Sequence, residues 1–267
     1  MQKTVLITGS TDGIGLEAAR LLLSRGHTVL LHGRNPKKLG AAVERLSGDA
    51  CPERIESFVA DLSHMNEVDA LARTIAERNA PLDVLINNAG ILRAQEPKTR
   101  DGLDVRFAVN AIAPYLLTQR LLPLLGPSGR IVNLSSAAQS PVDLEALASA
   151  IPMPDMKAYA QSKLAITMWS RHLALSLDDS GPVVVALNPG SLLGTKMVKE
   201  GLGMDGKDIG IGARIVVRAA LSDEFESASG EYFDNDAGRF ASPHADALNP
   251  RKTESVVRAI ERVLAAL

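Results

Sequence analysis

Tyr159 and Lys163 stand four residues apart in the segment KAYAQSKLA at 157–165. On a helix, side chains at this spacing lie one above the other, within ~6 Å. A free phenol has a pKa of about 10, which is too high for an efficient base near neutrality. A lysine ammonium at ~4 Å and an effective dielectric of ~20 is worth about 4 kcal/mol, or roughly three pKa units. The pair therefore predicts an acid/base catalyst, although a lysine stem that merely packs past an aromatic ring has the same spacing.

A glycine-rich turn follows the first apolar run of the chain. Residues 8–15 read TGSTDGIG, between the candidate strand TVLIT and a helix-period stretch. Glycines here permit a tight turn and let the backbone approach a pyrophosphate, while the helix N-terminus offers free N–H donors. In this context the turn predicts a dinucleotide site. The residues expected to bind the cofactor in this turn are Gly9, Ser10, Thr11, Gly13, Ile14 and Gly15.

The end of the second candidate strand bears on which dinucleotide binds. An NAD site usually has an acidic residue about 20 residues further on, which holds the ribose 2′-hydroxyl. Here the stretch reads LLHGRN, so Gly33 occupies that place and Arg34 follows it. A planar guanidinium suits a 2′-phosphate because it makes paired, charge-assisted hydrogen bonds. The sequence favours NADP(H), with NAD(H) and a solvated loop arginine as alternatives, and the nearby negative charge of Asp12 counts against it.

The elements that must position these residues alternate along the chain. Candidate strands are β-branched apolar runs at 4–8, 28–32, 55–60, 82–87, 129–135 and 182–188. Candidate helices are periodic stretches at 14–25, 36–47, 66–79, about 102–125, 157–178 and about 252–266. Strands separated by helices indicate right-handed βαβ units. We expect an α/β fold with a doubly wound (Rossmann) parallel sheet, flanked by helices on both faces, and one dinucleotide-binding and catalytic domain over residues 1–267.

Two segments break the alternation. Residues 137–156 contain three prolines, and residues 191–207 are rich in Gly, Leu and Met. Both follow the carboxyl ends of predicted parallel strands, where open α/β sheets bind ligands. We expect 137–156 to be an insertion and 191–207 to be a mobile substrate loop that closes over an apolar carbonyl compound. Packing of these apolar side chains against the protein itself or a second subunit is the alternative.

Composition limits the class of protein. The net charge is −2, hydrophobic residues make up 46% and aromatic residues 3%, which suits a globular core and argues against nucleic-acid binding. Cys51 is the single cysteine, so no internal disulfide forms. No apolar run approaches the ~20 residues of a membrane span, and the N-terminus lacks signal-peptide features. We expect a cytoplasmic protein without a membrane span, and the histidine spacing predicts no metal site.

With these motifs described, the chain resembles the short-chain dehydrogenase/reductase family over residues 3 to about 235. The motifs appear in order as TGSTDGIG, DL (61–62), NNAG (87–90), VN (109–110), SS (135–136), YAQSK (159–163) and NPG (188–190). Residues 98–118 and AYAQSKLA most resemble the retinol-dehydrogenase-like subgroup. Ser136 precedes Tyr159 by more residues than in the shortest members, and PGSLLGT is one residue longer than the family's PGxxxT, which leaves the role of Thr195 open.

The resemblance implies specific roles for the site residues. Tyr159 is implied to be the acid/base, Lys163 its activator, Ser136 the residue that orients the carbonyl, and Asn110 part of a proton relay. The cofactor contacts that it adds are Asp61, Leu62, Asn88, Ala89, Gly90, Tyr159, Lys163, Pro189 and Gly190.

The implied activity is NADP(H)-dependent interconversion of a carbonyl and an alcohol, in which the cofactor supplies the hydride. The implied assembly is a homodimer or homotetramer. An NAD-dependent dehydrogenase of the same family is one alternative, and a non-catalytic dinucleotide-binding sensor or scaffold is another.

Overall fold

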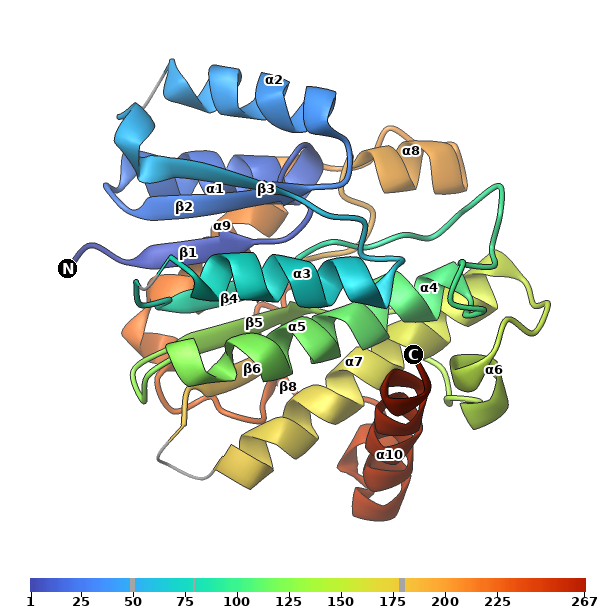
Figure 1. Ribbon diagram of the computed structural model, residues 1–267. Coiled ribbons are helices and arrows are strands. Elements are labelled where there is room, and N and C mark those ends of the chain that lie inside the picture. Colours follow the sequence, from blue (N-terminus) through green and yellow to red (C-terminus); the bar gives the residue numbers. More distant parts are fainter. Residues whose placement is uncertain (49–50, 79, 178–180) are drawn as a thin grey trace.

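One eight-stranded sheet organises the chain in the computed structural model, which describes residues 1–48, 51–78, 80–177 and 181–267. The strand order is β3-β2-β1-β4-β5-β6-β7-β8, and every neighbouring pair is parallel except β7–β8 (Figure 1). The strands are β1 (Thr4–Ile7), β2 (Thr28–Gly33), β3 (Ile55–Val59), β4 (Val84–Asn87), β5 (Arg130–Leu134), β6 (Val183–Asn188), β7 (Tyr232–Asp234) and β8 (Arg239–Ala241). The expected doubly wound parallel sheet is confirmed. Its order reverses between β1 and β4, which is where such sheets bind ligands.

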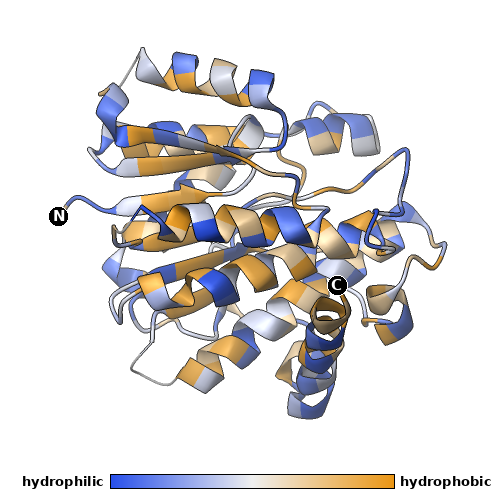
Figure 2. Cartoon of the chain, in the orientation of Figure 1, coloured by the Kyte–Doolittle hydropathy of each residue, from blue (hydrophilic) through white to orange (hydrophobic). Residues whose placement is uncertain are grey.

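Helices cover both faces of this sheet (Figure 1). One face packs against α1 (Gly13–Ser24), α2 (Pro36–Ser47) and α9 (Ile209–Leu221). The other packs against α3 (Met65–Ala76), α5 (Ala113–Leu121) and α7 (Asp155–Leu177), with α10 (Pro250–Ala266) against α7. Strand side chains alternate between these two cores, as with Leu6 in one and Val5 and Ile7 in the other. Figure 2 shows the result as apolar strands enclosed by helices whose polar sides face outward.

The predicted elements match β1–β6 and the longer helices to within a few residues, whereas several short elements were not predicted. The ends of the predicted helices at residues 79 and 178 lie outside the described residues. The unpredicted elements are α6 (Leu144–Ala148), α8 (Lys196–Leu202), α9, β7 and β8. α6 lies within the expected insertion and α8 within the expected substrate loop. Apart from α9, which has 13 residues, these elements carry too few residues for a periodic pattern to show.

The helix predicted over about 102–125 is present over residues 105–124, but it is not one regular α-helix. It consists of α4 (Val105–Phe107), a π-helical turn (Ala108–Ile112), α5 and a 3₁₀ turn (Leu122–Leu124). Pro114 has no N–H to donate to the carbonyl of Asn110, and its ring would crowd that carbonyl in a regular α-helix. A π-turn accommodates both effects, and such turns often mark functional sites.

A buried arginine joins the helix that carries Asn110 to the helix that carries Tyr159. Arg106 is 1% exposed, and its Nε donates to Asp104 Oδ1 at 2.8 Å. Its other nitrogens donate to Asp104 and to Asp155, the first residue of α7. Asp104 is itself 2% exposed and also accepts from the backbone N–H of Arg106. Loss of the guanidinium would therefore leave a carboxylate buried without its counter-charge.

Arg106→Met should lower the free energy of unfolding by about 3–5 kcal/mol, because removing one partner strands a buried charge. The matched control is Arg93→Met, since Arg93 also faces Asp155, at 4.0 Å, but its side chain is 63% exposed. That change should cost less than about 1 kcal/mol. Urea denaturation of the two variants measures both values. Equal losses would contradict this account of the α4–α7 junction.

Candidate active site

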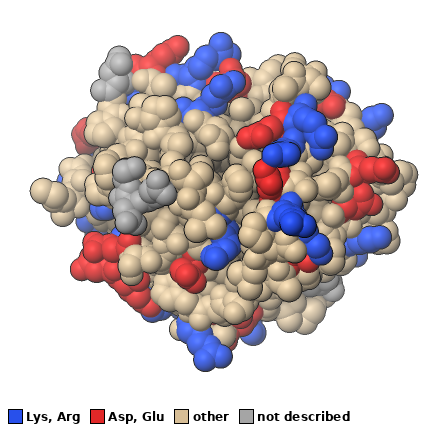
Figure 3. All heavy atoms as spheres, turned by 90° about the horizontal axis from the view of Figure 1, so that it is seen from below, with Lys and Arg blue, Asp and Glu red and all other residues tan. Residues whose placement is uncertain are grey.

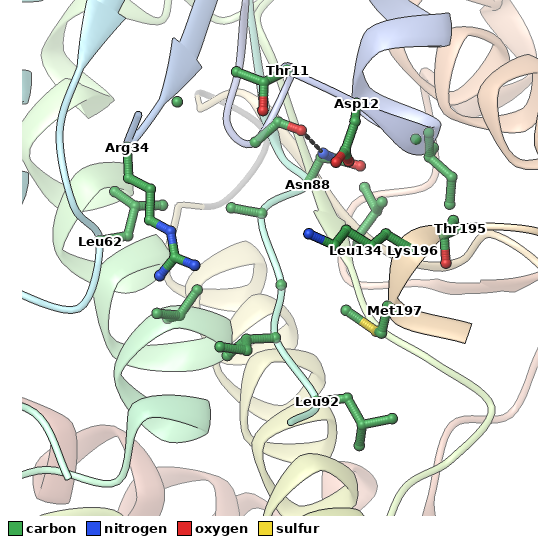
Figure 4. A pocket seen from close by; sticks show the side chains of 18 of the residues that line it. Thr11, Asp12, Arg34, Leu62, Asn88, Leu92, Leu134, Thr195, Lys196 and Met197 are labelled. Atoms are coloured by element: carbon green, nitrogen blue, oxygen red, sulfur yellow. Dashed lines mark hydrogen bonds between the residues drawn. The ribbon is translucent and has the colours of Figure 1, made fainter. Parts of the chain in front are cut away.

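A cleft of about 500 Å³ opens at the carboxyl ends of the parallel strands (Figure 4). Its wall combines the turn after β1, the end of β2, the segments after β3 and β4, and part of α7 and α8. These segments are far apart in sequence, and the parallel sheet brings their ends to one edge. In Figure 4, Thr11 and Asp12 lie on one side of the cleft, Arg34 on a second, and Thr195, Lys196 and Met197 opposite Arg34.

The glycine turn after β1 is packed directly against the segment after β4. Gly9 has φ +65°, and a Cβ there would lie 2.8 Å from the Cα of Ala89. A Cβ at Gly15 would lie 2.5 Å from Asn88 Nδ2 and 2.5 Å from the Gly9 carbonyl oxygen. The Asn88 amide donates to the carbonyls of Thr8 and Gly9 at 2.8 and 2.9 Å. Both glycines are therefore required by backbone approach, and Asn88 locks the turn.

His32 holds the same turn from the β2 side. Its Nδ1 accepts from the backbone N–H of Gly9 at 3.2 Å, and its Nε2 lies 3.0 Å from the Ala60 carbonyl. This arrangement requires the neutral tautomer with the proton on Nε2. Burial lowers the pKa of His32 from 6.5 to about 4 against the opposing effects of the Ala60 carbonyl and Asp61. The sequence carries no signal for this role of His32, because the role depends on backbone groups of two other segments.

The end of β2 forms the positively charged part of the cleft. Arg34 extends into the cleft beside Leu62 (Figure 4), and Lys38 from the first turn of α2 also lines it. Asn35 caps α2 by accepting from the backbone N–H of Lys38. A Cβ at Gly33 would lie 2.4 Å from Thr11 Cγ2, so an acidic side chain there would require Thr11 to move.

Asp61 lines this part of the cleft, but its carboxylate is engaged internally. Its Oδ1 accepts from the backbone N–H and the hydroxyl of Ser63 at 2.9 and 2.7 Å. Burial opposes ionisation of this carboxyl. The Ser63 hydrogen bonds and the charges of His64 and Arg34 outweigh that effect and lower the pKa of Asp61.

Tyr159 and Lys163 lie together on the cleft wall, on α7. The Lys163 Nζ is 5.7 Å from the centre of the Tyr159 ring and donates to the Leu134 carbonyl at 2.7 Å. Lys163 is 3% exposed, and this burial lowers its pKa to about 8. Burial raises the pKa of Tyr159, and a hydrogen bond from Ser136 opposes that rise. Burial therefore dominates the pKa of Tyr159, and the neighbour that lowers this pKa is Ser136 rather than Lys163, which the spacing had predicted.

The two serines after β5 have opposite surroundings. Ser135 is 3% exposed, and its hydroxyl donates to the Lys163 carbonyl and pairs with Thr167 at 2.7 Å, so it joins β5 to α7. Ser136 is half-buried, and it lies close enough to Tyr159 to lower the pKa of the phenol. Its Oγ accepts from the Ala138 N–H at 3.1 Å, which fixes the direction of the hydroxyl. Of the adjacent pair, Ser136 is the one that reaches the catalytic tyrosine candidate.

Asn110 is fully buried behind the cleft wall, in the π-turn. Its Oδ1 accepts from the Ile91 N–H at 2.8 Å, and its Nδ2 donates to the Ile91 carbonyl and the Ser162 hydroxyl, each at 2.9 Å. The side chain therefore connects the segment after Gly90 to α7. Its carbonyl cannot receive the α-helical hydrogen bond from position 114, which is proline.

The NPG segment after β6 is fastened by the turn between β7 and β8. Asn188 Nδ2 donates to Asp234 and Asp236 at 2.8 and 3.0 Å, and Asn235 Nδ2 donates to the Pro189 carbonyl at 2.9 Å. Asp236 also accepts from the backbone N–H and hydroxyl of Ser191. The start of the expected substrate loop is thus held in place.

The rest of that loop folds over the cleft as α8. Thr195, whose role the sequence left open, caps α8 by accepting from the Val198 N–H and lies beside Gly13. A Cβ at Gly201 would lie 2.7 Å from Leu92 Cδ2, so α8 packs closely on the segment after β4. Leu193 is 3% exposed and packs on Gly212 of α9, so it belongs to the core.

The expected site residues divide into those that line the cleft and those that support it. The lining residues are Gly9, Thr11, Gly13, Ile14, Arg34, Asp61, Leu62, Asn88, Ala89, Gly90, Tyr159, Lys163 and Pro189. Among the described residues, the expected ones outside the lining are Ser10, Gly15, Asn110, Ser136 and Gly190. Cleft residues that the sequence analysis did not assign to the site include His32, Lys38, Leu92, Lys196 and Glu200.

Comparison with known proteins agrees with this geometry. The short chain dehydrogenase family matches residues 3–203. The chain belongs to this family. It is an oxidoreductase of the retinol-dehydrogenase-like subgroup, as the resemblance in sequence implied.

Similar proteins of known name include two dehydrogenases from mammals. Mouse retinol dehydrogenase 13 is 33% identical over 91% of this chain and 79% of its own length. Human polyprenol dehydrogenase is 32% identical over 88% of this chain and 77% of its own length. A short-chain dehydrogenase from Brassica napus, TIC 32 A, chloroplastic, is 35% identical over 86% of this chain and 79% of its own length.

Solved structures extend the comparison to cofactor complexes. A Mycobacterium paratuberculosis protein has a TM-score of 0.82 at 28% identity, covering 98% of this chain and 93% of its own. The Pseudomonas aeruginosa RhlG/NADP complex has a TM-score of 0.71 at 26% identity, covering 88% and 95%. A Burkholderia cenocepacia short chain dehydrogenase in complex with NADP has a TM-score of 0.68 at 27% identity, covering 87% and 95%. These likenesses support binding of a nicotinamide dinucleotide in the cleft.

None of the helices in the described parts of the chain combines the length and apolar character that crossing a bilayer requires.

The buried imidazole of His32 should make stability depend on pH. Between pH 6.5 and about 4 the unfolded chain takes up a proton that folded His32 does not, so the free energy of unfolding falls as pH falls. The full loss is about 3 kcal/mol, and His27, whose pKa burial also lowers, adds in the same direction. His32→Asn keeps an acceptor for Gly9 but does not titrate. Urea denaturation between pH 4 and 7 should therefore show a flatter pH slope in the variant, and an unchanged slope would contradict this role.

Proposed function

We propose that the protein is an NADP(H)-dependent oxidoreductase that interconverts a carbonyl and an alcohol, with Tyr159 as the acid/base. The observation that carries this proposal is that Tyr159 and Lys163 lie together on the wall of the dinucleotide cleft, with Ser136 next to Tyr159, where it lowers the pKa of the phenol. The cleft runs from the positive end of β2 to this pair, which is the arrangement that an extended dinucleotide requires. We infer that residues 1–267 act as one dinucleotide-binding and catalytic unit.

The chain's own residues provide the proton and the orientation. Bound in the cleft, the dinucleotide supplies or accepts the hydride. In the reducing direction, the Ser136 hydroxyl and the Tyr159 hydroxyl both donate to the substrate oxygen, and Tyr159 gives up its proton as that oxygen becomes an alkoxide. In the oxidising direction the Tyr159 phenolate takes the alcohol proton. Lys163, with a pKa lowered to about 8 by burial, provides the charge that stabilises this phenolate.

A proton path from Tyr159 into the protein is part of the proposal. The Lys163 ammonium already donates to the Leu134 carbonyl, and the Asn110 carbonyl has no α-helical partner because position 114 is proline. A water held by this carbonyl and the ammonium would pass protons from Lys163 toward solvent.

Three features support the preference for NADP(H) over NAD(H). Arg34 and Lys38 both line the β2 end of the cleft, where a 2′-phosphate would lie. Gly33 is packed against Thr11, so the position usually held by an acidic residue has no room for one unless Thr11 moves. Similar proteins have been solved with NADP or NADPH, including one from Escherichia coli CFT073 at 27% identity.

We infer an apolar carbonyl or alcohol as the substrate. Ile91, Leu92 and Met197 line the cleft on the α8 side, next to the catalytic pair. Methionine adapts its shape to irregular apolar ligands. The insertion contributes less than the sequence suggested, since Met153 packs against the core cluster and Ile151 and Met156 are 38% and 46% exposed. Within segment 191–207, α8 would be the part that closes over the substrate, because Met197 lines the cleft whereas Leu193 is buried in the core.

We further propose a cytoplasmic homodimer or homotetramer without a nucleic-acid partner. On the face shown in Figure 3, acidic and basic side chains are interspersed around a broad uncharged area, with no continuous basic surface on that face. Size-exclusion chromatography with light scattering would establish the number of subunits. An NAD-dependent enzyme and a non-catalytic dinucleotide sensor are the alternatives, and the presence of Ser136, Tyr159 and Lys163 together favours an enzyme.

Tyr159→Phe should reduce kcat for carbonyl reduction by at least about 100-fold, because the ring remains and only the proton donor is lost. The affinity for NADPH, measured by fluorescence titration, should stay within about twofold of wild type. Tyr115→Phe is the matched control, since that hydroxyl bonds Glu261 on α10, away from the cleft. Retention of more than a few per cent of kcat by Tyr159→Phe would reject the acid/base assignment.

Arg34→Ala should weaken NADPH binding by roughly ten- to a hundredfold, because a hydrogen bond to a charged phosphate is lost, and should change NADH binding far less. The control is Lys37→Ala, the exposed neighbour that does not line the cleft. Isothermal titration with both cofactors measures the difference without requiring a substrate. Equal affinity of the wild type for NADPH and NADH would rule out the proposed preference.

A further inference from the structure

A second tyrosine, from a strand two positions away on the same face of the sheet, contacts the catalytic serine candidate. Tyr232, on β7, donates from its hydroxyl to the backbone carbonyl of Ser136 at 3.1 Å. It is 6% exposed and 96 positions distant in sequence from Ser136. Neither the family motifs quoted above nor the cleft lining includes it.

The sheet register explains how the side chain reaches its target. Tyr232 lies opposite Ala186 of β6, and Ala186 lies opposite Asn133 of β5, so the three share one face of the sheet. Asn133 bonds Ser170 of α7, which identifies this face as the α7 side. Because Ala186 carries only a methyl group, the phenol ring can extend over β6 toward the segment that follows β5.

Ser136 is held at both its carbonyl and its hydroxyl. The carbonyl accepts from Tyr232 and from Gln139 Nε2, the latter at 2.9 Å, and the Oγ accepts from the Ala138 N–H. Ser136 lies beyond the last residue of β5, where no ladder bond fixes its carbonyl. The two side-chain donors therefore set the backbone orientation from which the Ser136 hydroxyl points to Tyr159.

The Tyr232 hydroxyl remains a donor throughout the range of an enzyme assay. Burial raises its pKa, and the carboxylates of Asp234 and Asp236 raise it further, against a smaller opposing effect of Gln139. The Ser136 carbonyl has no proton to offer, so the direction of the hydrogen bond is fixed.

We propose that Tyr232 is a positioning residue, which fixes the Ser136 backbone so that the Ser136 hydroxyl is aligned with Tyr159 and the substrate oxygen. This inference rests on the proposed function for its kinetic consequence. Its structural part, the hydrogen bond from Tyr232 to the Ser136 carbonyl, stands on the geometry alone.

The test compares Tyr232→Phe with Tyr115→Phe, since both residues are 6% exposed and each change removes one hydrogen-bonding hydroxyl while keeping the ring. Tyr232→Phe should lower kcat about tenfold, because a misaligned group loses rate without losing binding. KM and the NADPH Kd should stay within about twofold of wild type. Gln139→Leu, which removes the other donor to the same carbonyl, should lower kcat in the same way.

The pH profile separates positioning from a general loss of structure. The polar groups next to Tyr159 are Ser136, from the segment after β5, and Lys163, from α7 itself, whose Nζ lies 5.7 Å from the centre of the ring. The Ser136 hydrogen bond lowers the pKa of Tyr159, so loosening it should move the acid limb of alcohol oxidation to higher pH in Tyr232→Phe. Tyr115→Phe should leave that limb unchanged.

A spectroscopic measurement tests the link even if no substrate turns over. With ¹³Cζ-labelled tyrosine the chain's three tyrosines give three signals, which the three Tyr→Phe variants assign. The Tyr159 signal should shift in Tyr232→Phe and stay in place in Tyr115→Phe. An unmoved Tyr159 signal together with wild-type kcat would overturn the inference. Absence of turnover in the wild type would instead reject the proposed function, and the Tyr159 signal would still decide for or against the link.

Discussion

The close contact between the ends of β1 and β4 is the constraint on which the site depends. Gly9 lies so near Ala89 that no side chain fits between them, and the Asn88 amide bonds the carbonyls that β1 leaves unpaired. Backbone groups at the end of a buried strand must find partners, because water does not reach them. Here the carbonyls of Thr8 and Gly9 are satisfied by Asn88, the residue that follows β4. This contact brings the glycine turn, the start of α1 and the segment after β4 to one place.

Polar side chains at this edge of the sheet divide into those that hold the structure and those that face the cleft. Ser135 is bonded to α7, and Asn87 donates to Thr118 and Asn133 beneath the sheet. Asn88, the neighbour of Asn87, lines the cleft, and Ser136, the neighbour of Ser135, lies next to Tyr159. For Asn87 and Asn88 the division follows from the alternation of side chains at a strand end, where one residue faces the core helices and the next faces the opening.

The carboxyl-terminal part of the chain, beyond the catalytic pair, supports the site from the other side. The β7–β8 turn fastens the NPG segment through Asn235 and Asp236, and Tyr232 of β7 reaches the carbonyl of Ser136. The last two strands therefore contact both the start of the closing loop and the catalytic serine candidate. Two short strands are sufficient for these contacts, because the hydrogen bonds to the NPG segment and to Ser136 come from side chains and from the β7–β8 turn, not from pairing along a long strand.

The sequence by itself determined the strand–helix alternation, the glycine turn and the Tyr159–Lys163 pair, because each depends on neighbouring residues whose spacing is read along one strand, turn or helix. It also indicated Arg34 at the end of β2, which lies in the cleft as expected. Only the tertiary structure decided that burial, rather than Lys163, dominates the pKa of the phenol. His32 and Tyr232 were equally hidden, because their partners are backbone groups of distant segments. Hydrogen bonds to backbone leave no signature in residue type, and desolvation depends on everything packed around a group, so neither can be read from local spacing.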